Sequence, residues 1–259
     1  MGKADLHLHT AYSPDATTTV RGVLKCAKDA RLDLIAVTDH DEIRGAFEAR
    51  ELASQYGVHV VTGVEVSTAQ GHLVGLFIEK VPPAGLSLAE TVLRIGDMGG
   101  IAIAPHPNAP YPSSPKLKII LEARAHPRAK NVLVGIEVYT MGYRFFDKRT
   151  REITRPMPLS QVASSDSHVY WTVGTGRTQF AGSTPAELRQ ALEQFSTIAI
   201  PAAQEVISKP LIAWMNHMVL KRLGYVFDSS SPERPIRLSR YRRNQYPVKA
   251  AKPKTSADR

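Results

Sequence analysis

Histidines and carboxylates in this 259-residue chain fall into short motifs whose residue types and spacing suit the coordination of metal ions. The stretch ADLHLHT places His7 and His9 two residues apart. If this stretch is a strand, both imidazoles point to the same face and can reach one ion. A carboxylate, Asp15, follows in a loop, where its alternative role is that of a turn residue or a helix cap. Alternatively, the two histidines are simply exposed to solvent near the terminus. The pair alone does not distinguish the two hypotheses, so the rest of the sequence is needed.

Further histidines and carboxylates stand at or near the ends of other short apolar runs, in the motifs TDHD, GVE, GHLVGLF, PHPN and SSDSH. In parallel α/β proteins, ligands bind at the carboxyl edge of the sheet. One of these residues, His72, opens its run and could equally be an ordinary strand residue. The predicted metal ligands are His7, His9, Asp15, His40, Glu65, His72, His106, Asp166 and His168.

Such a concentration of carboxylates requires cations, because without them the acids would repel one another or take up protons. Imidazole and carboxylate ligands without thiolates suit Zn²⁺, Mn²⁺ or Fe²⁺. The candidates outnumber the ligands that one ion can use, so we expect two or three divalent ions as cofactors. Paired ions activate water at neutral pH and clamp the attacking and leaving oxygens of a displacement.

Other polar residues next to these motifs are expected to support the site. Asp39 and Asp41 flank His40 and are predicted to orient an imidazole, although Asp41 could instead cap a helix. Glu137 in the run VLVGIE is either such a partner or part of the edge of the core. Arg177 in VGTGRTQF could bind a substrate phosphate with its planar guanidinium, or it is a surface arginine between strands.

Apolar runs alternate with helical patterns over the first 200 residues, which predicts βαβ units in a parallel sheet or barrel. The predicted strands cover 3–8, 33–38, 58–66, 72–78, 101–105, 132–139 and 159–164, and the predicted helices cover 18–31, 43–56, 87–98, 115–126 and 143–154. Capping boxes in SLAE and TPAE mark two helix starts. We expect a barrel over 1–207, a helix over 208–228 that packs on or near it, and a basic, flexible tail over 229–259.

The net charge of +9 is concentrated at the end of the chain. Residues 232–259 contain nine Lys or Arg and two Asp or Glu, a net charge of +7, which leaves +2 for the rest. This segment could contact nucleic acid or an anionic surface, although its commonest explanation is a solvated, disordered end.

The single cysteine, Cys26, lies on the apolar side of a helical pattern and is expected to be a small core residue. One cysteine excludes an internal disulfide framework and is consistent with a reducing cytosol. The chain has no apolar run approaching the length of a membrane span, and its first residues lack the apolar stretch of a signal peptide. We therefore expect a cytoplasmic protein without a membrane span.

The motifs DLHLHT, AVTDHD, GVE, PHPN and SSDSH occur in the order of the motifs of the PHP (polymerase and histidinol phosphatase) phosphoesterases, which the chain resembles over residues 3–200. The resemblance implies an α/β fold, a distorted (β/α)7 barrel of PHP type, to which this chain adds a C-terminal helical extension and a basic tail. It also implies a two- or three-metal site. The first ion would be held by His7, His9, Glu65 and Asp166, the second by Glu65, His106 and His72, and the third by Asp15, His40 and His168.

The resemblance further implies hydrolysis of a phosphomonoester, and GHLVGLF is similar to the branch that acts on nucleotides and RNA ends. Because neither a G-x-S-x-G motif nor a P-loop is found, we expect metal-activated water to be the nucleophile. An amidohydrolase-like metal hydrolase also uses an early H-x-H, but its bridging lysine cannot be placed. A third hypothesis is a barrel that has lost catalysis and serves as a binding module, which an incomplete ligand set would favour.

Overall fold

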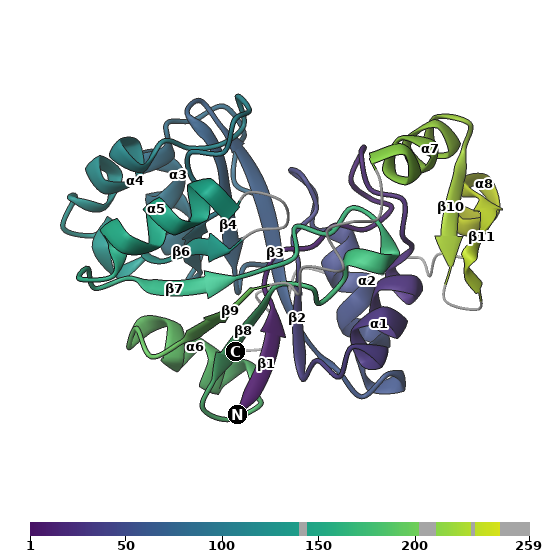
Figure 1. Ribbon diagram of the computed structural model, residues 1–259, viewed down its shortest axis with the longest axis horizontal. Coiled ribbons are helices and arrows are strands. Elements are labelled where there is room, and N and C mark those ends of the chain that lie inside the picture. The colour runs from purple at the N-terminus through teal and green to yellow at the C-terminus, as the bar shows by residue number, and fades with distance from the viewer. Residues whose placement is uncertain (140–143, 202–210, 229–230, 244–259) are drawn as a thin grey trace, which may run out of the picture.

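The computed structural model describes residues 1–139, 144–201, 211–228 and 231–243. Its centre is a nine-stranded sheet with the spatial order β7-β6-β5-β4-β3-β2-β1-β8-β9 (Figure 1). The strands are β1 (Gly2–Asp5), β2 (Leu34–Val37), β3 (His59–Thr68), β4 (Gly71–Leu76), β5 (Ile101–Ala104), β6 (Leu133–Tyr139), β7 (Ser160–Ala163), β8 (Arg177–Phe180) and β9 (Ile198–Ile200).

Strand directions show that the sheet is mixed. β1, β2 and β3 are parallel to one another, as are β5, β6 and β7. β4 runs antiparallel to both β3 and β5, and β8 runs antiparallel to β1 and β9. Thr197, next to β9, donates a side-chain hydrogen bond of 3.0 Å to the carbonyl of Gln161 in β7, so the two edges of the sheet meet. The predicted distorted barrel is confirmed, with a mixed sheet in place of a parallel one.

The strands predicted from the sequence are all present within a few residues of their expected bounds. β8 and β9 are not among the predictions, because four and three residues give too short a pattern to recognise. β1 ends at Asp5, so His7 and His9 lie just beyond the strand rather than on it. Leu8 between them forms a bridge with Ser167, which continues the pairing across the barrel end.

Helices cover the outside of the barrel, with α3, α4 and α5 at the left of Figure 1 and α1 and α2 at the right. The helices of the barrel are α1 (Val20–Asp29), α2 (Arg44–Leu52), α3 (Leu88–Asp97), α4 (Leu117–Arg124), α5 (Arg144–Thr154) and α6 (Pro185–Glu193). Both predicted capping boxes are present, at Ser87 before α3 and at Thr184 before α6. Thr19 caps α1 by accepting a hydrogen bond from the backbone of Gly22.

Two apolar layers hold the barrel together. The inner layer fills the barrel and includes Leu6 and Phe180, whereas the outer layer, with Leu24 and Val37, lies between the sheet and the helices. Burial of each such side chain contributes about 1.5–3 kcal/mol. Cys26 packs against the outer layer, and burial raises the pKa of its thiol to about 11. It is partly buried, at the edge of the core rather than within it.

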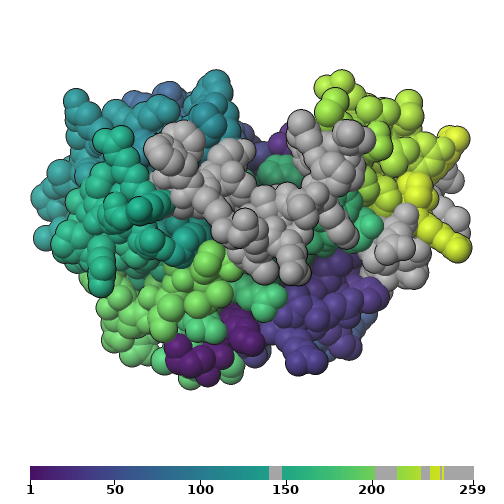
Figure 2. Space-filling model, viewed as in Figure 1, coloured from purple at the N-terminus to yellow at the C-terminus, as the bar shows by residue number. Residues whose placement is uncertain are grey.

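Beyond the barrel, the chain forms a lobe that we call the C-terminal unit. It consists of α7 (Leu211–Arg222), β10 (Tyr225–Asp228), β11 (Ser231–Arg237) and α8 (Leu238–Arg243). β10 and β11 pair antiparallel as a small separate sheet. Figure 1 shows this unit next to α1, and Figure 2 shows it as a lobe above the surface of the first helices.

The C-terminal unit differs in detail from the sequence expectation. Residues 211–228 form a helix followed by a strand rather than one helix, and residues 231–243 of the expected tail form a strand and a helix. Residues 244–259, with much of the predicted basic tail and its possible nucleic-acid contacts, lie outside the described residues, as does the predicted boundary at 207. Within the described residues, no helix combines the length and the hydropathy that crossing a membrane requires.

Candidate metal centre

The nine predicted ligands come together at one end of the barrel. Most of them follow the carboxyl ends of β1, β2, β5 and β7, and Glu65 lies within β3. His72 reaches the same end from the start of its strand, because β4 runs antiparallel to β3. Because β4 is antiparallel, its first residues lie at the metal end of the barrel. In a purely parallel barrel, the start of this strand would lie at the opposite end.

Glu65 is at the centre of this cluster, and its carboxylate is buried. Its Oε2 atom lies 3.0 Å from Nδ1 of His40, 3.2 Å from Nε2 of His9 and 3.3 Å from Nε2 of His7. One carboxylate oxygen therefore faces three imidazole nitrogens.

The other oxygen of Glu65, Oε1, faces a second group of histidines. It lies 2.9 Å from Nδ1 of His72 and 3.2 Å from Nε2 of His106. Because its two oxygens face separate groups of nitrogens, Glu65 has the geometry expected of a carboxylate that bridges two ions.

Burial divides the cluster into two ends. The deep end consists of His7, His9, Glu65 and His106, whose side chains are at most 3% exposed. The rim consists of Asp15, His40, His72 and His168, whose side chains are 16–43% exposed. Asp166 joins the two ends: its Oδ1 atom lies 3.4 Å from Nε2 of His7 at the deep end and 3.7 Å from Nδ1 of His168 at the rim.

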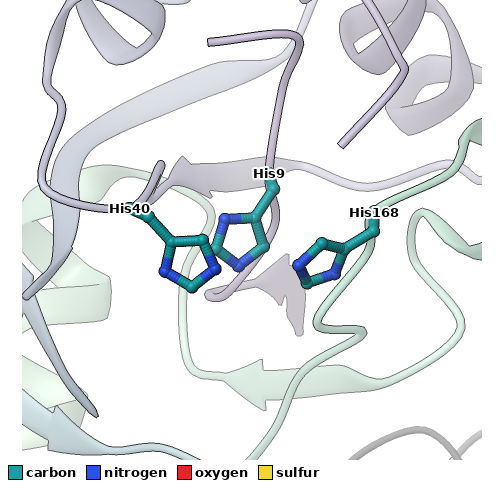
Figure 3. A group of neighbouring side chains, drawn as sticks. All are labelled: His9, His40 and His168. Carbon is teal, nitrogen blue, oxygen red and sulfur yellow. The ribbon is translucent and has the colours of Figure 1, made fainter. Parts of the chain in front are cut away.

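At the rim, Asp15 stands between two histidines. Its Oδ2 atom lies 3.3 Å from Nε2 of His40 and 3.3 Å from Nε2 of His168. Figure 3 shows these two imidazoles on either side of His9, whose ring centroid is 4.5 Å from that of His40 and 4.3 Å from that of His168. The rim and the deep end are therefore parts of one continuous cluster.

Hydrogen bonds assign the protonated nitrogen of two of these histidines. Nδ1 of His7 donates to Oε1 of Glu137 at 3.1 Å, and Nδ1 of His168 donates to the carbonyl of Asp166 at 2.9 Å. In the neutral imidazole the Nε2 atom then carries a lone pair. For His7 the Nε2 atom lies 3.3 Å from Oε2 of Glu65, so a lone pair there would meet a second electron-rich atom unless a proton or a metal ion lay between them. A cation between such atoms would turn repulsion into attraction.

His9 is oriented in the same way, through a serine that the sequence analysis does not single out. Oγ of Ser13 donates to Oδ1 of Asp39 at 2.8 Å, and accepts from Nδ1 of His9 at 3.0 Å and from the backbone of His40 at 3.1 Å. Asp39 is fixed in turn by the backbone N–H of Thr10 at 2.7 Å. Asp39 therefore acts on His9 through Ser13, and a loop serine carries no signal in the sequence that would reveal this.

Unpaired atoms give a test of whether the cluster fits metal ions. Oδ1 of Asp15 and Nδ1 of His106 are buried and have no hydrogen-bond partner among the described residues, and Oε2 of Glu65 is buried without a well-aligned hydrogen bond to the three nitrogens around it. A buried polar atom without a partner costs about 1–3 kcal/mol. Oxygen and imidazole nitrogen donors without a thiolate are the set that Zn²⁺, Mn²⁺ and Fe²⁺ accept. The residues present thus fit divalent ions.

Charges within the cluster shift the pKa values of its members as expected for a strongly negative site. Burial alone lowers the pKa of His7, but neighbouring carboxylates, above all Glu65, outweigh burial and raise that pKa well above its usual value. Burial also lowers the pKa of His168, and Asp15 and Asp166 raise it to about 9. The cluster attracts positive charge, and protons and metal ions compete for the same nitrogens.

Three residues of the site have left-handed backbone conformations, which are uncommon outside glycine. The φ angles are 28° at His106, 48° at Asp166 and 48° at Asp41. Such conformations cost of order 1–3 kcal/mol and cluster at functional sites. The side chain of Asp41 accepts a hydrogen bond from the backbone of Ser67 at 2.9 Å, so it ties the loop after β2 to β3 rather than orienting an imidazole.

Arg177, predicted to be either a phosphate ligand or a surface arginine, bonds to backbone outside the cluster. Its Nε atom donates to the carbonyl of Gly174 at 2.6 Å. Its neighbour Thr178 is buried and bonds to Ala163 of β7, and Phe180 belongs to the inner apolar layer. Because side chains alternate along a strand, Arg177 points to the outer face of β8.

Comparison with known proteins agrees with the geometry of the site. The PHP domain family model matches residues 5–198, which include nearly all of the barrel and every predicted ligand. Over 179 residues, 65% of this chain and 98% of the relative, the sequence is 44% identical to the uncharacterized protein MJ1587 of Methanocaldococcus jannaschii. Over 88 residues, 32% of this chain and 30% of the relative, it is 39% identical to the 3',5'-nucleoside bisphosphate phosphatase of Chromobacterium violaceum.

Among solved structures, PsfC from Pseudomonas syringae PB-5123 is similar to this chain with a TM-score of 0.61. The similarity covers 86% of this chain and 99% of that protein at 18% sequence identity, so it shows a shared fold. The family match, the order of the motifs and the barrel with its cluster all agree. The chain belongs to the PHP domain family.

Proposed function

We propose that this protein is a metal-dependent phosphoesterase that hydrolyses a phosphomonoester. The proposal is carried by the imidazole nitrogens and carboxylate oxygens that converge on Glu65 at the end of the barrel. Ions held by such donors activate water and neutralise phosphoryl oxygens. Membership of the PHP domain family, whose relatives include a phosphatase, supports the same class of reaction.

The ligand sets that we propose follow the cluster from its deep end to its rim. The first ion is assigned to His7, His9, Glu65 and Asp166, the second to Glu65, His106 and His72, and the third to Asp15, His40 and His168. His40 and His72 lie close enough together to share an ion with Glu65. Because His72 is assigned to the second ion and His40 to the third, we infer that these two ions are neighbours.

The chain's own residues have three tasks in this proposal. Glu137 and Ser13 hold His7 and His9 with Nε2 directed at the centre of the cluster. The buried carboxylate of Glu65 provides negative charge that retains cations. The partly exposed rim leaves a side from which a phosphate group can approach. When bound, the ions would lower the pKa of a water molecule and polarise the phosphorus.

For the substrate we propose a nucleotide or the phosphate at an RNA end. The support comes from the similarity to the nucleoside bisphosphate phosphatase, although this chain matches only about a third of that relative. The motif GHLVGLF, with His72 in the cluster, is consistent with the same branch of the family.

The test is release of inorganic phosphate from a panel of 3',5'-bisphosphorylated nucleosides, mononucleotides, 5'-phosphorylated RNAs and sugar phosphates. Each reaction contains Mn²⁺, Zn²⁺ or Fe²⁺, or a chelator. We expect metal-dependent release that the chelator abolishes, with the highest kcat/KM for a nucleotide or RNA substrate.

Other outcomes would select the alternative functions. Cleavage of amides or cyclic ureides without phosphate release would favour an amidohydrolase-like enzyme. Protein that is folded and loaded with metal but inactive on the whole panel would favour a binding module, and either result would overturn the proposal.

A further inference from the structure

The C-terminal unit lies outside the family match, yet it contacts the loop that carries part of the candidate site. This loop, residues 10–19, connects His9 to α1 and contains Ser13 and Asp15. Ser13 orients His9, and Asp15 stands between the two histidines of the rim. Ser13 is itself fixed by Asp39 of the barrel, so whatever holds the rest of this loop acts on Asp15 and the rim.

Lys221, in the last turn of α7, makes the most direct contact. Its ammonium donates hydrogen bonds to the backbone carbonyls of Ala11 at 2.8 Å, Ser13 at 3.1 Å and Ala16 at 2.6 Å. An ammonium has three donors and no acceptor, so three carbonyls match its hydrogen-bonding capacity. Hydrogen bonds from a charged donor are also stronger than those from a neutral one.

The positions of these carbonyls along the chain are informative. Ser13 precedes Asp15 by two residues and Ala16 follows it by one, so the ammonium of Lys221 fixes the backbone on both sides of the carboxylate. Ser13 and Ala16 are buried, whereas the side chain of Asp15 is 43% exposed. The exposed carboxylate thus gains its placement from the backbone beneath it.

Other contacts of the C-terminal unit involve the end of the same loop, just after Ala16. They also indicate that the unit holds this loop in place. The backbone of Phe227 in β10 accepts from Thr19 at 2.8 Å and donates to Thr17 at 2.9 Å. His217 in α7 stacks on Phe227 with 3.9 Å between ring centroids, and its Nδ1 lies 3.1 Å from Oγ1 of Thr17. These contacts dock the unit, whereas Lys221 alone among the named residues reaches the carbonyls around Asp15.

We propose that Lys221 is a positioning residue that holds Asp15 in place to complete the metal position at the rim. The inference rests on the proposed function only in its assignment of Asp15, His40 and His168 as ligands of one ion. It makes the C-terminal unit part of the metal centre, although the unit supplies no ligand itself.

The experiment counts bound ions rather than turnover. The full-length protein is titrated with Co²⁺, and visible d–d absorption and elemental analysis report how many ions bind and how tightly. Asp15→Asn should lose the weakest-bound ion. Lys221→Met, which keeps the length of the side chain, should weaken that same ion about 10–100-fold, as loss of a supporting residue typically does. The other ions should bind as in the wild type.

Two matched variants separate this role from general support of the fold. Arg222→Met alters the next, exposed residue of α7 and should leave every ion unaffected. Tyr241→Phe removes the hydrogen bonds of Tyr241 to Glu48 and to the backbone of Val20, which dock α8, and should also spare the rim ion. Unchanged ion binding in Lys221→Met, or equal weakening in Tyr241→Phe, would overturn the inference.

The double variant Asp15→Asn/Lys221→Met gives an independent check. If Lys221 acts through Asp15, the double variant should bind ions as Asp15→Asn does, because the two changes then fail to add. Additive losses would contradict the proposal. If Lys221→Met selectively weakens the rim ion but the protein hydrolyses no phosphoester, this inference stands and the proposed function is refuted. If the protein hydrolyses a phosphoester but Lys221→Met leaves ion binding unchanged, the proposed function stands and this inference is refuted.

Discussion

The deep end and the rim of the cluster use the same residue types but are held in different ways. At the deep end, the imidazoles of His7 and His9 are fixed by carboxylates, directly by Glu137 and through Ser13 by Asp39. At the rim, Asp15 is carried by a loop whose carbonyls are bound by Lys221 of the C-terminal unit. The barrel itself builds the deep end and supplies His40, His72 and His168 of the rim, whereas Asp15 lies on a loop held by a segment that follows the barrel.

This difference has a thermodynamic meaning. Ligands that are preorganised on strand ends lose little conformational entropy when an ion binds, whereas ligands on a loop must first be ordered. We therefore expect tight ion binding at the deep end and weaker, adjustable binding at the rim.

The largest effect should follow from removing a ligand at the deep end. His9→Ala removes an imidazole that contacts both Glu65 and Asp166, and should lower kcat at least about 1,000-fold, which corresponds to roughly 4 kcal/mol. Phosphate release and ion stoichiometry are the measurements. His59→Ala, which alters an exposed histidine at the start of β3, is the control and should keep full activity. Activity near the wild-type level with all ions bound would remove His9 from the proposed ligand set.

A smaller effect should follow from weakening the support of a deep ligand. Glu137→Gln keeps the shape of the side chain but removes the charge that faces Nδ1 of His7, so metal affinity at the deep end should fall about 10–100-fold. Titration with metal under a competing chelator measures this change. Glu122→Gln at an exposed site of α4 is the matched control. Equal affinity in both variants would show that His7 needs no charged partner.

The smallest effect concerns the docking of the C-terminal unit beneath the rim. Burial lowers the pKa of His217 to about 4, from 6.5 for an exposed histidine. The unfolded state therefore binds a proton before the folded state does, and stability is lost as the pH falls from about 6.5 to about 4. Hydrogen-exchange protection of the Thr19 amide, bonded to Phe227, should fall over this range, while that of the His9 amide, bonded to Ser167, should not.

A variant at the same position tests the assignment to this histidine. In His217→Phe, protection of the Thr19 amide should vary less with pH, since no titrating group stacks on Phe227. If the wild type and the variant lose protection in parallel, another group governs the docking of the unit.

The metal ligands at the deep end can be predicted from the sequence more fully than the residues that support them. Metal-type residues such as His7, Glu65 and His106 stand at strand ends, and the fold of a barrel brings strand ends together, so their meeting follows from the pattern. The orienting contact of Glu137 with His7 is one of the alternatives that the sequence leaves open.

The supports of the rim carry no comparable signal. Lys221 looks like any charged residue in the last turn of a helix, and its partners are backbone carbonyls, which every residue has. For Arg177 the sequence leaves two alternatives open, a phosphate ligand or a surface arginine, and the alternation of side chains along β8 favours the second. Tertiary placement, rather than residue type, decides both cases.

The pairing of β1 with both β2 and β8 has a consequence for synthesis of the chain. The strand that leads into His7 and His9 leaves the ribosome well before its neighbour β8 and the lysine of α7. Until then one edge of β1 has no partner, and such edges invite pairing with other chains. Contacts so distant in sequence also slow folding. Nascent molecules of this protein should therefore depend on chaperones more than their size suggests, and should acquire their ions only after β8 and α7 have been synthesised.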